Sequence, residues 1–254
     1  MKVTFLGTGT SQGVPVIGCD CPVCSSLDFR NKRTRCAIHL EIDGKSLVID
    51  TGPDFRTQML REKINKLDAV LFTHEHKDHT AGLDDIRPFN FSQKKDMPIY
   101  GTKKVLNQIK REYSYIFEEV KYPGVPSVVP YEITNAPFIA EEIPVIPIQV
   151  MHYRLPVLGF RFKDFTYITD AKSIEKKEIE KIKGSKVLVL NALQKSHHIS
   201  HLTLKEAIQL TEIIKPEVAY FTHISHKLGT HQEIEKELPS HIKLAFDGLK
   251  IQID

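Results

Sequence analysis

The chain has 254 residues, of which 41% are hydrophobic and 26% are charged, and this suits one compact globular domain or two small ones. A formal net charge of +3 does not by itself indicate a nucleic-acid-binding protein. No apolar run approaches the roughly 18 residues of a membrane helix, and the first residues lack the long apolar run of a signal peptide, so we expect a cytoplasmic protein without a membrane partner.

Short apolar runs rich in β-branched residues predict strands along the whole chain. They cover residues 2–6, 36–42, 46–50, 68–72, 97–101, 143–151, 158–162, 165–169, 186–191 and 217–223. Apolar residues at helical spacing predict helices between these strands, over residues 53–64, 102–120, 173–183 and 202–214. The proline-containing segment 121–132 is predicted to be an irregular connection, either a lid or a boundary between two halves. Strands and helices mix in both halves, which indicates an α/β or layered α+β class.

The stretch "LFTHEHKDHT", residues 71–80, follows a predicted strand and crowds His74, His76, Asp78 and His79 into six positions. Neutral imidazole and ionised carboxylate are ligands for zinc, manganese and iron. A solvated histidine-rich loop is the alternative, but surface loops draw more on Ser, Gly, Asn and Lys. Two sets of ligands from one short loop indicate a site for two metal ions.

Further ligand-type residues stand at the ends of other predicted strands. His152, Asp170 and His223 each follow an apolar run, and the two oxygens of Asp170 suit it to bridge two ions. Asp50 also ends a strand. It is either a carboxylate that orients a ligand imidazole or an ordinary turn aspartate before Gly52, and the sequence favours neither.

The segment "THEHKDH" resembles the T-H-x-H-x-D-H signature of the metallo-β-lactamase superfamily, and His152, Asp170 and His223 match its later ligands in order and type. The opening "FLGTGTSQGVPVIGCDCPVC" is similar to the phosphodiesterases of the phosphonate-utilisation pathway that act on phosphoribosyl 1,2-cyclic phosphate. The resemblance covers nearly the whole chain. It implies a single hydrolase domain over residues 1–254, folded as a four-layer αβ/βα sandwich with the metal site on one edge.

The motif "CDCPVC" places Cys19, Cys21 and Cys24 at a spacing close to those of zinc sites. Three thiolates leave a closed structural site one ligand short. Cys36 is chemically able to complete it, but it stands in a predicted strand interior, where a buried free thiol is common. The resemblance implies His226 as the fourth ligand of one structural zinc ion.

His201 precedes a predicted helix, and the resemblance makes it a general acid or a phosphate-contacting group. An imidazole suits either role, because phosphodiester hydrolysis must protonate or stabilise a leaving alkoxide. His198 is the second candidate for this role. The basic run "NKRTRC" could contact phosphate through Arg33 or Arg35, but a solvated charged face is the favoured interpretation.

These residues predict a metal-dependent phosphodiesterase that hydrolyses a small, cyclic phosphodiester. Two divalent cations, zinc or manganese, would bind the strand-end ligands, with Asp78 both a ligand and essential to catalysis, and a homodimer is compatible with the sequence. One alternative is a nuclease that matures transfer-RNA 3′ ends. The modest charge and the lack of an obvious RNA-grasping arm make this nucleic-acid partner less favoured. The other alternative is a non-catalytic zinc-binding relative, which the full ligand set argues against.

Overall fold

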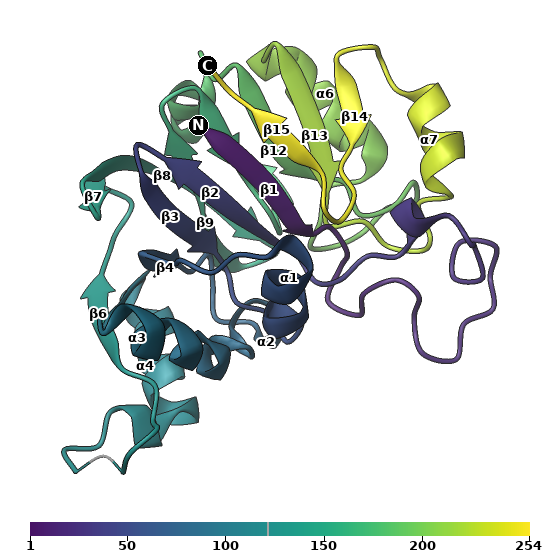
Figure 1. Cartoon of the computed structure of the whole chain (residues 1–254). Coiled ribbons are helices and arrows are strands. Elements are labelled where there is room, and N and C mark those ends of the chain that lie inside the picture. Colours follow the sequence, from purple (N-terminus) through teal and green to yellow (C-terminus); the bar gives the residue numbers. More distant parts are fainter. Residues whose placement is uncertain (121) are drawn as a thin grey trace.

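A computed structural model describes residues 1–120 and 122–254 and contains two β-sheets that pack face to face (Figure 1). The first sheet has seven strands in the order β15-β1-β2-β3-β4-β5-β6. Its strands are β1 (Lys2–Gly7), β2 (Ala37–Ile42), β3 (Lys45–Ile49), β4 (Ala69–Leu71), β5 (Met97–Gly101), β6 (Val128–Glu132) and β15 (Lys250–Gln252). Strands β3 to β6 pair in parallel, whereas β15, β1, β2 and β3 pair in antiparallel fashion.

The second sheet has eight strands, with the order β11-β8-β9-β10-β12-β13-β14 and with β7 paired to β8. Its strands are β7 (Phe138–Ala140), β8 (Ile143–His152), β9 (Leu155–Phe162), β10 (Phe165–Tyr167), β11 (Ser173–Ile174), β12 (Val187–Asn191), β13 (Val218–Thr222) and β14 (Ile242–Leu244). Strands β10, β12, β13 and β14 pair in parallel. Each sheet is therefore part parallel and part antiparallel.

The helices cover the outer faces of the two sheets. They are α1 (Phe55–Glu62), α2 (Lys77–Thr80), α3 (Arg87–Gln93), α4 (Lys103–Glu112), α5 (Lys176–Ile182), α6 (Leu204–Ile214) and α7 (His231–Glu237), with short 3-10 turns at Phe29–Asn31, Leu83–Ile86 and Ser114–Ile116. Helices α1, α3 and α4 share a hydrophobic cluster with the first sheet, and α5, α6 and α7 share another with the second. The arrangement is the expected four-layer αβ/βα sandwich.

Strand β12 shows why the chain needs helices outside both sheets. Val187 and Val189 point into the core between the sheets, whereas Leu188 and Leu190 belong to the cluster beneath the helices. Successive side chains of a strand point to opposite faces, so a strand that is apolar throughout must be covered on both sides. The continuous apolar run "VLVLN" therefore encodes a buried central strand.

Three predicted elements differ from the structure. Residues 173–174, expected to begin a helix, form strand β11, which pairs with β8. The helix expected over residues 102–120 ends at Glu112, because Tyr113 leaves helical geometry and donates a hydrogen bond from its hydroxyl to the carbonyl of Thr80 at 3.0 Å. The segment 121–132, expected to be irregular, contains strand β6, which pairs with β5. Lys121 at its start lies outside the described residues.

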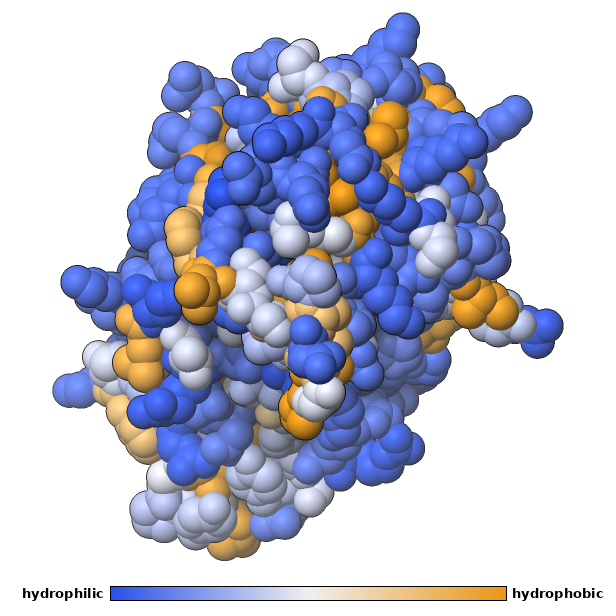
Figure 2. Space-filling model, turned by 90° about the vertical axis from the view of Figure 1, so that its right-hand side faces the viewer, coloured by the Kyte–Doolittle hydropathy of each residue, from blue (hydrophilic) through white to orange (hydrophobic). Residues whose placement is uncertain are grey.

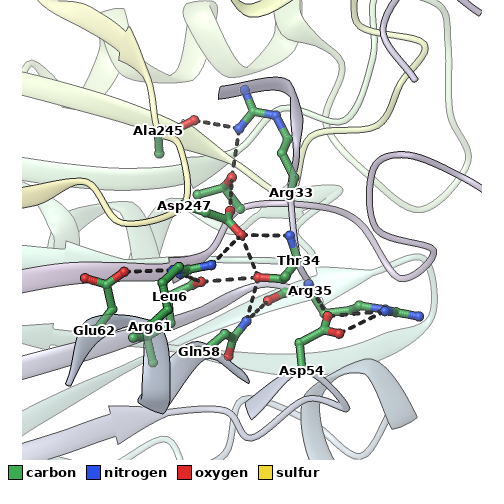
Figure 3. Close-up of polar contacts among 11 residues, drawn as sticks. Leu6, Arg33, Thr34, Arg35, Asp54, Gln58, Arg61, Glu62, Ala245 and Asp247 are labelled. Atoms are coloured by element: carbon green, nitrogen blue, oxygen red, sulfur yellow. Dashed lines mark hydrogen bonds and ion pairs between the residues drawn. The ribbon is translucent and has the colours of Figure 1, made fainter. Parts of the chain in front are cut away.

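A buried polar network joins the loop before β2 to α1 and to the end of the chain (Figure 3). The Asp247 carboxylate accepts hydrogen bonds from the Thr8 hydroxyl at 2.8 Å and from the Thr34 amide at 2.8 Å. Arg33 donates to the Thr8 hydroxyl at 2.8 Å and to the carbonyl of Ala245 at 2.6 Å. The prediction of a solvated face was wrong for Arg33, which is 3% exposed. Its guanidinium group can be buried because Thr8, Ala245 and His231, from three distant segments, provide its hydrogen-bond partners.

The surface on the side of α7 and of the loop before β2 is mainly hydrophilic, with hydrophobic residues in small separate groups (Figure 2). Scattered exposed apolar side chains are ordinary on a folded protein. In the described part of the chain, every helix is too short or too polar to cross a bilayer.

Candidate metal centre

The predicted ligands meet where the parallel strands of both sheets end. Asp50 follows β3, the His74–His79 loop follows β4, Asp170 follows β10 and His223 follows β13. The backbone φ angles of Asp50, Asp170 and His223 are 67°, 57° and 54°. This left-handed conformation costs a non-glycine residue about 1 kcal/mol, and such strain concentrates at functional sites.

Close backbone packing fixes the short helix α2 that carries Asp78 and His79. The Thr51 amide donates to the carbonyl of His79 at 2.8 Å. A Cβ atom at Gly52 would lie 2.2 Å from the carbonyl oxygen of Asp78. Only glycine allows this approach, so the "DTG" sequence after β3 sets the position of both α2 ligands.

Asp170 lies at the centre of the cluster and faces imidazoles with both oxygens. Its Oδ2 is 3.3 Å from His79 Nε2, and its Oδ1 is 3.2 Å from His223 Nε2. Asp78 Oδ2 lies 3.2 Å from the same His79 nitrogen. Asp170 and His223 are almost completely buried, with 2% and 1% exposure. Carboxylate and imidazole groups from α2, β10 and β13 thus converge on one buried point.

His74, His76 and His152 lie on the other side of the cluster. His74 Nε2 is 3.0 Å from His76 Nδ1, and the rings of His76 and His152 are 5.3 Å apart between centroids. His74 is buried, whereas His76 is exposed and His152 half-buried. This side of the cluster therefore opens toward the surface.

Neighbouring acceptors fix which nitrogen of three imidazoles carries the proton. His79 Nδ1 lies 2.7 Å from Asp50 Oδ2, and His152 Nδ1 lies 3.0 Å from the carbonyl of Ser200. The Thr73 hydroxyl donates to Asp50, so its oxygen accepts from His74 Nδ1 at 3.0 Å. A proton on each Nδ1 leaves each Nε2 lone pair free to bind a metal ion.

Burial lowers the pKa of His74, His152 and His201, the last to about 2. These imidazoles are therefore neutral at neutral pH, the form that binds metal. Burial also acts to lower the pKa of His79, but the charges of Asp50, Asp170 and Asp78 outweigh it and raise that pKa well above its usual value. The carboxylates thus create a strongly negative potential inside the cluster.

Buried imidazole nitrogens without partners show that the cluster fits metal cations. His79 Nε2 and His223 Nε2 are buried and lie 3.2–3.3 Å from carboxylate oxygens without hydrogen-bond geometry. His201 Nδ1 and His223 Nδ1 are buried without a hydrogen-bond partner among the described residues. Such atoms are rare in folded proteins and require an explanation. The ligand atoms of three sets, each of which includes Asp170 or His79, lie within 4.8 Å of one another. Imidazole and carboxylate donors at this spacing suit divalent cations.

His201, the candidate acid, lies against the same cluster. Its ring is 4.5 Å from that of His152 and 4.6 Å from that of His223, between centroids. Thr203 begins helix α6 with a capping box, which fixes the turn that carries His201. His198 is further out, with its ring 5.1 Å from that of His201. The structure therefore places His201 nearer than His198 to the metal-type ligands.

The cysteine cluster forms a second donor set, in which Cys19, Cys21 and Cys24 surround His226. The three sulfur atoms lie 3.2, 3.5 and 3.5 Å from His226 Nδ1. A hydrogen bond from the Cys24 amide lowers the pKa of Cys21 to about 6, toward the thiolate that binds metal. Cys36 lies apart from this set, with its sulfur 3.3 Å from the Thr222 hydroxyl, and its burial raises its pKa to about 12.

One feature of the site was missed from the sequence. A cavity of about 560 Å³ next to the exposed side of the cluster is lined by His76, His152, Tyr153, Arg154, Leu155, Ile199 and Ser200. Tyr153 and Arg154 form the turn between β8 and β9. In the sequence, Tyr153 and Arg154 are marked only by their position directly after His152, and this position does not distinguish cavity residues from ordinary turn residues.

Residues 45–224, most of the chain, match the family model of the beta-lactamase superfamily domain. The chain belongs to the metallo-β-lactamase superfamily. The superfamily generally uses divalent metal ions, and the cluster of donors described above is of a kind that binds them.

The chain is similar over its whole length to several known proteins. It is 41% identical to the octanoyltransferase of Porphyromonas gingivalis and spans 52% of that longer protein, about half its length. It is 39% identical to a new diphosphatase from the PhnP family, with a TM-score of 0.93 and coverage of 100% of this chain and 98% of that one. The Zn²⁺-bound PqqB of Methylobacterium extorquens shares the fold at 19% identity, with a TM-score of 0.80 and full coverage of both chains.

Proposed function

We propose that this protein is a metal-dependent hydrolase, a phosphodiesterase that uses two divalent cations, zinc or manganese, to cleave small cyclic phosphodiesters. The observation that carries the proposal is the convergence of strand-end imidazoles and carboxylates on Asp170, whose two oxygens face His79 and His223. The 39% identity to a PhnP-family diphosphatase over the whole chain supports phosphoryl chemistry. The adjoining cavity of about 560 Å³ suits a small molecule.

The geometry suggests how the ligands divide between the two cations. One cation would be held by His74, His76 and His152 and the other by Asp78, His79 and His223, and Asp170 would be available to either of them. When bound, the cations supply Lewis acidity that activates water and offsets the negative charge of the phosphoryl group. Asp50 and the Ser200 carbonyl keep the protons of His79 and His152 on Nδ1 and so aim each Nε2 inward.

His201 is assigned to the substrate and not to the cations. Its ring lies against His152 and His223, one from each proposed ligand set. Burial favours its neutral form, which can donate a hydrogen bond to a phosphate oxygen. A bound phosphate anion favours the protonated form, which can donate a proton to the leaving alkoxide. The two roles differ in how strongly they depend on the leaving group, so an experiment can separate them.

The cysteine cluster is assigned to one structural zinc ion. Three sulfurs and one imidazole nitrogen are a common tetrahedral zinc set. His226 stands three residues after His223, so this zinc would tie the loop of residues 19–24 to the segment that carries an active-site ligand.

Two other activities are less well supported. Octanoyl transfer belongs by name to a protein about twice as long, of which this chain matches about half. Its chemistry moves an acyl group, whereas the cluster offers imidazoles and carboxylates suited to hydrolysis. A transfer-RNA nuclease would share the metal ligands, and the substrate panel below includes precursor tRNA to test it.

The proposal is tested by measuring bound metals and activity on one purified preparation. The substrates are 2′,3′-cyclic nucleotides, a cyclic ribose phosphate, a chromogenic diester and precursor tRNA. We expect hydrolysis of the small cyclic diesters, and we expect Asp78→Ala to lose activity together with active-site metal. Preferred cleavage of precursor tRNA, or full metal occupancy without hydrolysis of any diester, would contradict the proposal.

The role of His201 is tested with diesters that differ in leaving group. We expect His201→Ala to retain its metals and to lose about 100-fold in kcat for an alkoxide leaving group, and much less for 4-nitrophenolate, which needs no proton. An equal loss for both leaving groups would instead assign His201 to contact with a phosphate oxygen. Parent-like rates for both would remove His201 from the mechanism.

A further inference from the structure

A side chain outside the proposed ligand set holds the carboxylate of Asp170. The Thr169 hydroxyl donates a hydrogen bond to Asp170 Oδ2 at 2.7 Å. Thr169 has no exposed surface, so a substrate in the adjoining cavity cannot contact it. Any effect of this hydroxyl group on the metal centre must therefore act through Asp170.

The backbone next to Asp170 is fixed by residues from other segments. The side-chain amide of Asn191, at the end of β12, accepts a hydrogen bond from the Ala171 amide at 2.7 Å and donates one to the Ala171 carbonyl at 3.0 Å. The Leu202 amide donates to the same carbonyl at 2.8 Å. Because these bonds hold the residue that follows Asp170, the carboxylate can change its position mainly by rotation of the side chain.

The hydrogen bond from Thr169 stabilises one orientation of the Asp170 carboxylate. In this orientation Oδ2 lies 3.3 Å from His79 Nε2, and Oδ1 lies 3.2 Å from His223 Nε2. The two oxygens of an ionised carboxylate offer about four lone-pair positions, and Thr169 uses one of those on Oδ2. A rotation that turns both oxygens toward one cation would break this hydrogen bond, so Thr169 opposes that rotation.

We infer that Thr169 is a positioning residue that keeps the two oxygens of Asp170 available to different cations. The inference rests on the proposed function for the presence of two cations. Without the hydroxyl group, the carboxylate is free to bind one cation with both oxygens, and the other cation then loses a ligand. The hydroxyl group should therefore affect the second active-site cation more than the first.

The inference is tested with Thr169→Val, which removes the hydroxyl group and keeps the branched shape of the side chain. Zinc competition with a chromophoric chelator, after removal of the active-site metal, gives the stepwise affinities of parent and variant. We expect the affinity for the second active-site zinc ion to fall about 10- to 100-fold, the usual effect of losing a group that orients a ligand, and the first to change little. Thr169→Ser retains a hydroxyl group and should restore the parent affinities. Parent-like affinities in Thr169→Val, or an equal loss for both ions, would overturn the inference.

Thr166→Val is the matched control, because Thr166 is a buried threonine of β10 whose hydroxyl oxygen lies 2.7 Å from Ser185 Oγ. It makes the same chemical change in the same strand, away from the metal ligands, and we expect both zinc affinities to equal those of the parent. A loss like that of Thr169→Val would assign the effect to a weakened strand and would overturn the inference. Thr169→Ala also lacks the hydroxyl group and places no methyl group there, so it replaces Thr169→Val in the titration if that variant does not fold.

Electron paramagnetic resonance of the manganese-loaded protein separates this inference from the proposed function, because it needs no substrate. We expect the parent to show the exchange-coupled signal of a cation pair, and Thr169→Val, at the same manganese concentration, to show mainly the signal of isolated manganese ions. Coupled signals of equal intensity in the two proteins would overturn the inference, whether or not a diester is hydrolysed. A coupled pair that Thr169→Val loses, in a parent that hydrolyses no diester, would support the inference and contradict the proposed function.

Discussion

Replacement of Asp50 by Asn tests whether the carboxylate after β3 controls the metal centre through His79. Asp50 is fully buried and accepts three hydrogen bonds, from the Thr73 amide at 2.8 Å, the Thr73 hydroxyl at 2.8 Å and His79 Nδ1 at 2.7 Å. An asparagine amide has one oxygen and one NH₂ group. At least one of the three donors would then face another donor.

His79 can relieve this clash of donors most readily, because its proton can move from Nδ1 to Nε2. With the proton on Nε2, the nitrogen that faces Asp78 and Asp170 can no longer bind a cation. Loss of such a supporting carboxylate lowers metal affinity about 10- to 100-fold, which corresponds to about 1.4–2.7 kcal/mol. We expect Asp50→Asn to lie in this range and to remain folded, because the substitution keeps the side-chain volume.

The assay is competition for zinc between the protein and a chromophoric chelator, with the free energy of unfolding measured on the same samples. Asp68→Asn is the control, since Asp68 is also buried and accepts a hydrogen bond from the Ser46 amide at 2.8 Å, but it lies before β4 and not among the metal ligands. An Asp50→Asn affinity equal to those of the parent and the control would refute the reasoning.

Two further predictions concern parts of the chain outside the active site. Cys21→Ser should release one zinc ion while the active-site metals remain bound, and it should lower the melting temperature, because one of four ligands to a structural ion is lost. Metal analysis and thermal unfolding measure these two effects. An unchanged zinc content would contradict the prediction. Burial lowers the pKa of His39 to about 4 in the folded protein, whereas in the unfolded chain it is about 6.5. Below pH 6.5 the unfolded chain therefore binds a proton at His39 that the folded protein does not, and the free energy of unfolding decreases as the pH falls toward 4. The fall in unfolding free energy from pH 7 to pH 5 should thus be about 2 kcal/mol larger for the parent than for His39→Gln, and equal falls would contradict this assignment.

The convergence of the proposed metal ligands was predictable from the sequence because His152, Asp170 and His223 each stand where an apolar run ends, and the His74–His79 loop follows another such run. Such runs mark buried strands, and the carboxyl ends of parallel strands meet at one edge of a sheet. The structure brings His152, Asp170 and His223 to the His74–His79 loop, as expected. The sequence left Asp50 open between two interpretations, and its 2.7 Å contact with His79 favours the orienting carboxylate.

Local patterns failed where long-range contacts decide the structure. Strands β11, β14 and β15 have two or three residues each and form only through pairing with β8, β13 and β1, which lie 20 or more residues away in the chain. The helical periodicity of residues 113–117 did not extend α4, because Tyr113 and Tyr115 form hydrogen bonds with Thr80 and Asp84 instead. Arg33 gave no local sign of burial, since its partners Thr8, Ala245 and His231 are far from it in sequence.

The most direct test of the account is anomalous diffraction from crystals of the metal-loaded protein at the zinc and manganese edges. We expect a pair of cations about 3.5–4 Å apart, with Asp170 between them, and one separate zinc ion on Cys19, Cys21, Cys24 and His226. A single cation at Asp170, or cations bound away from the strand-end ligands, would contradict the two-metal mechanism.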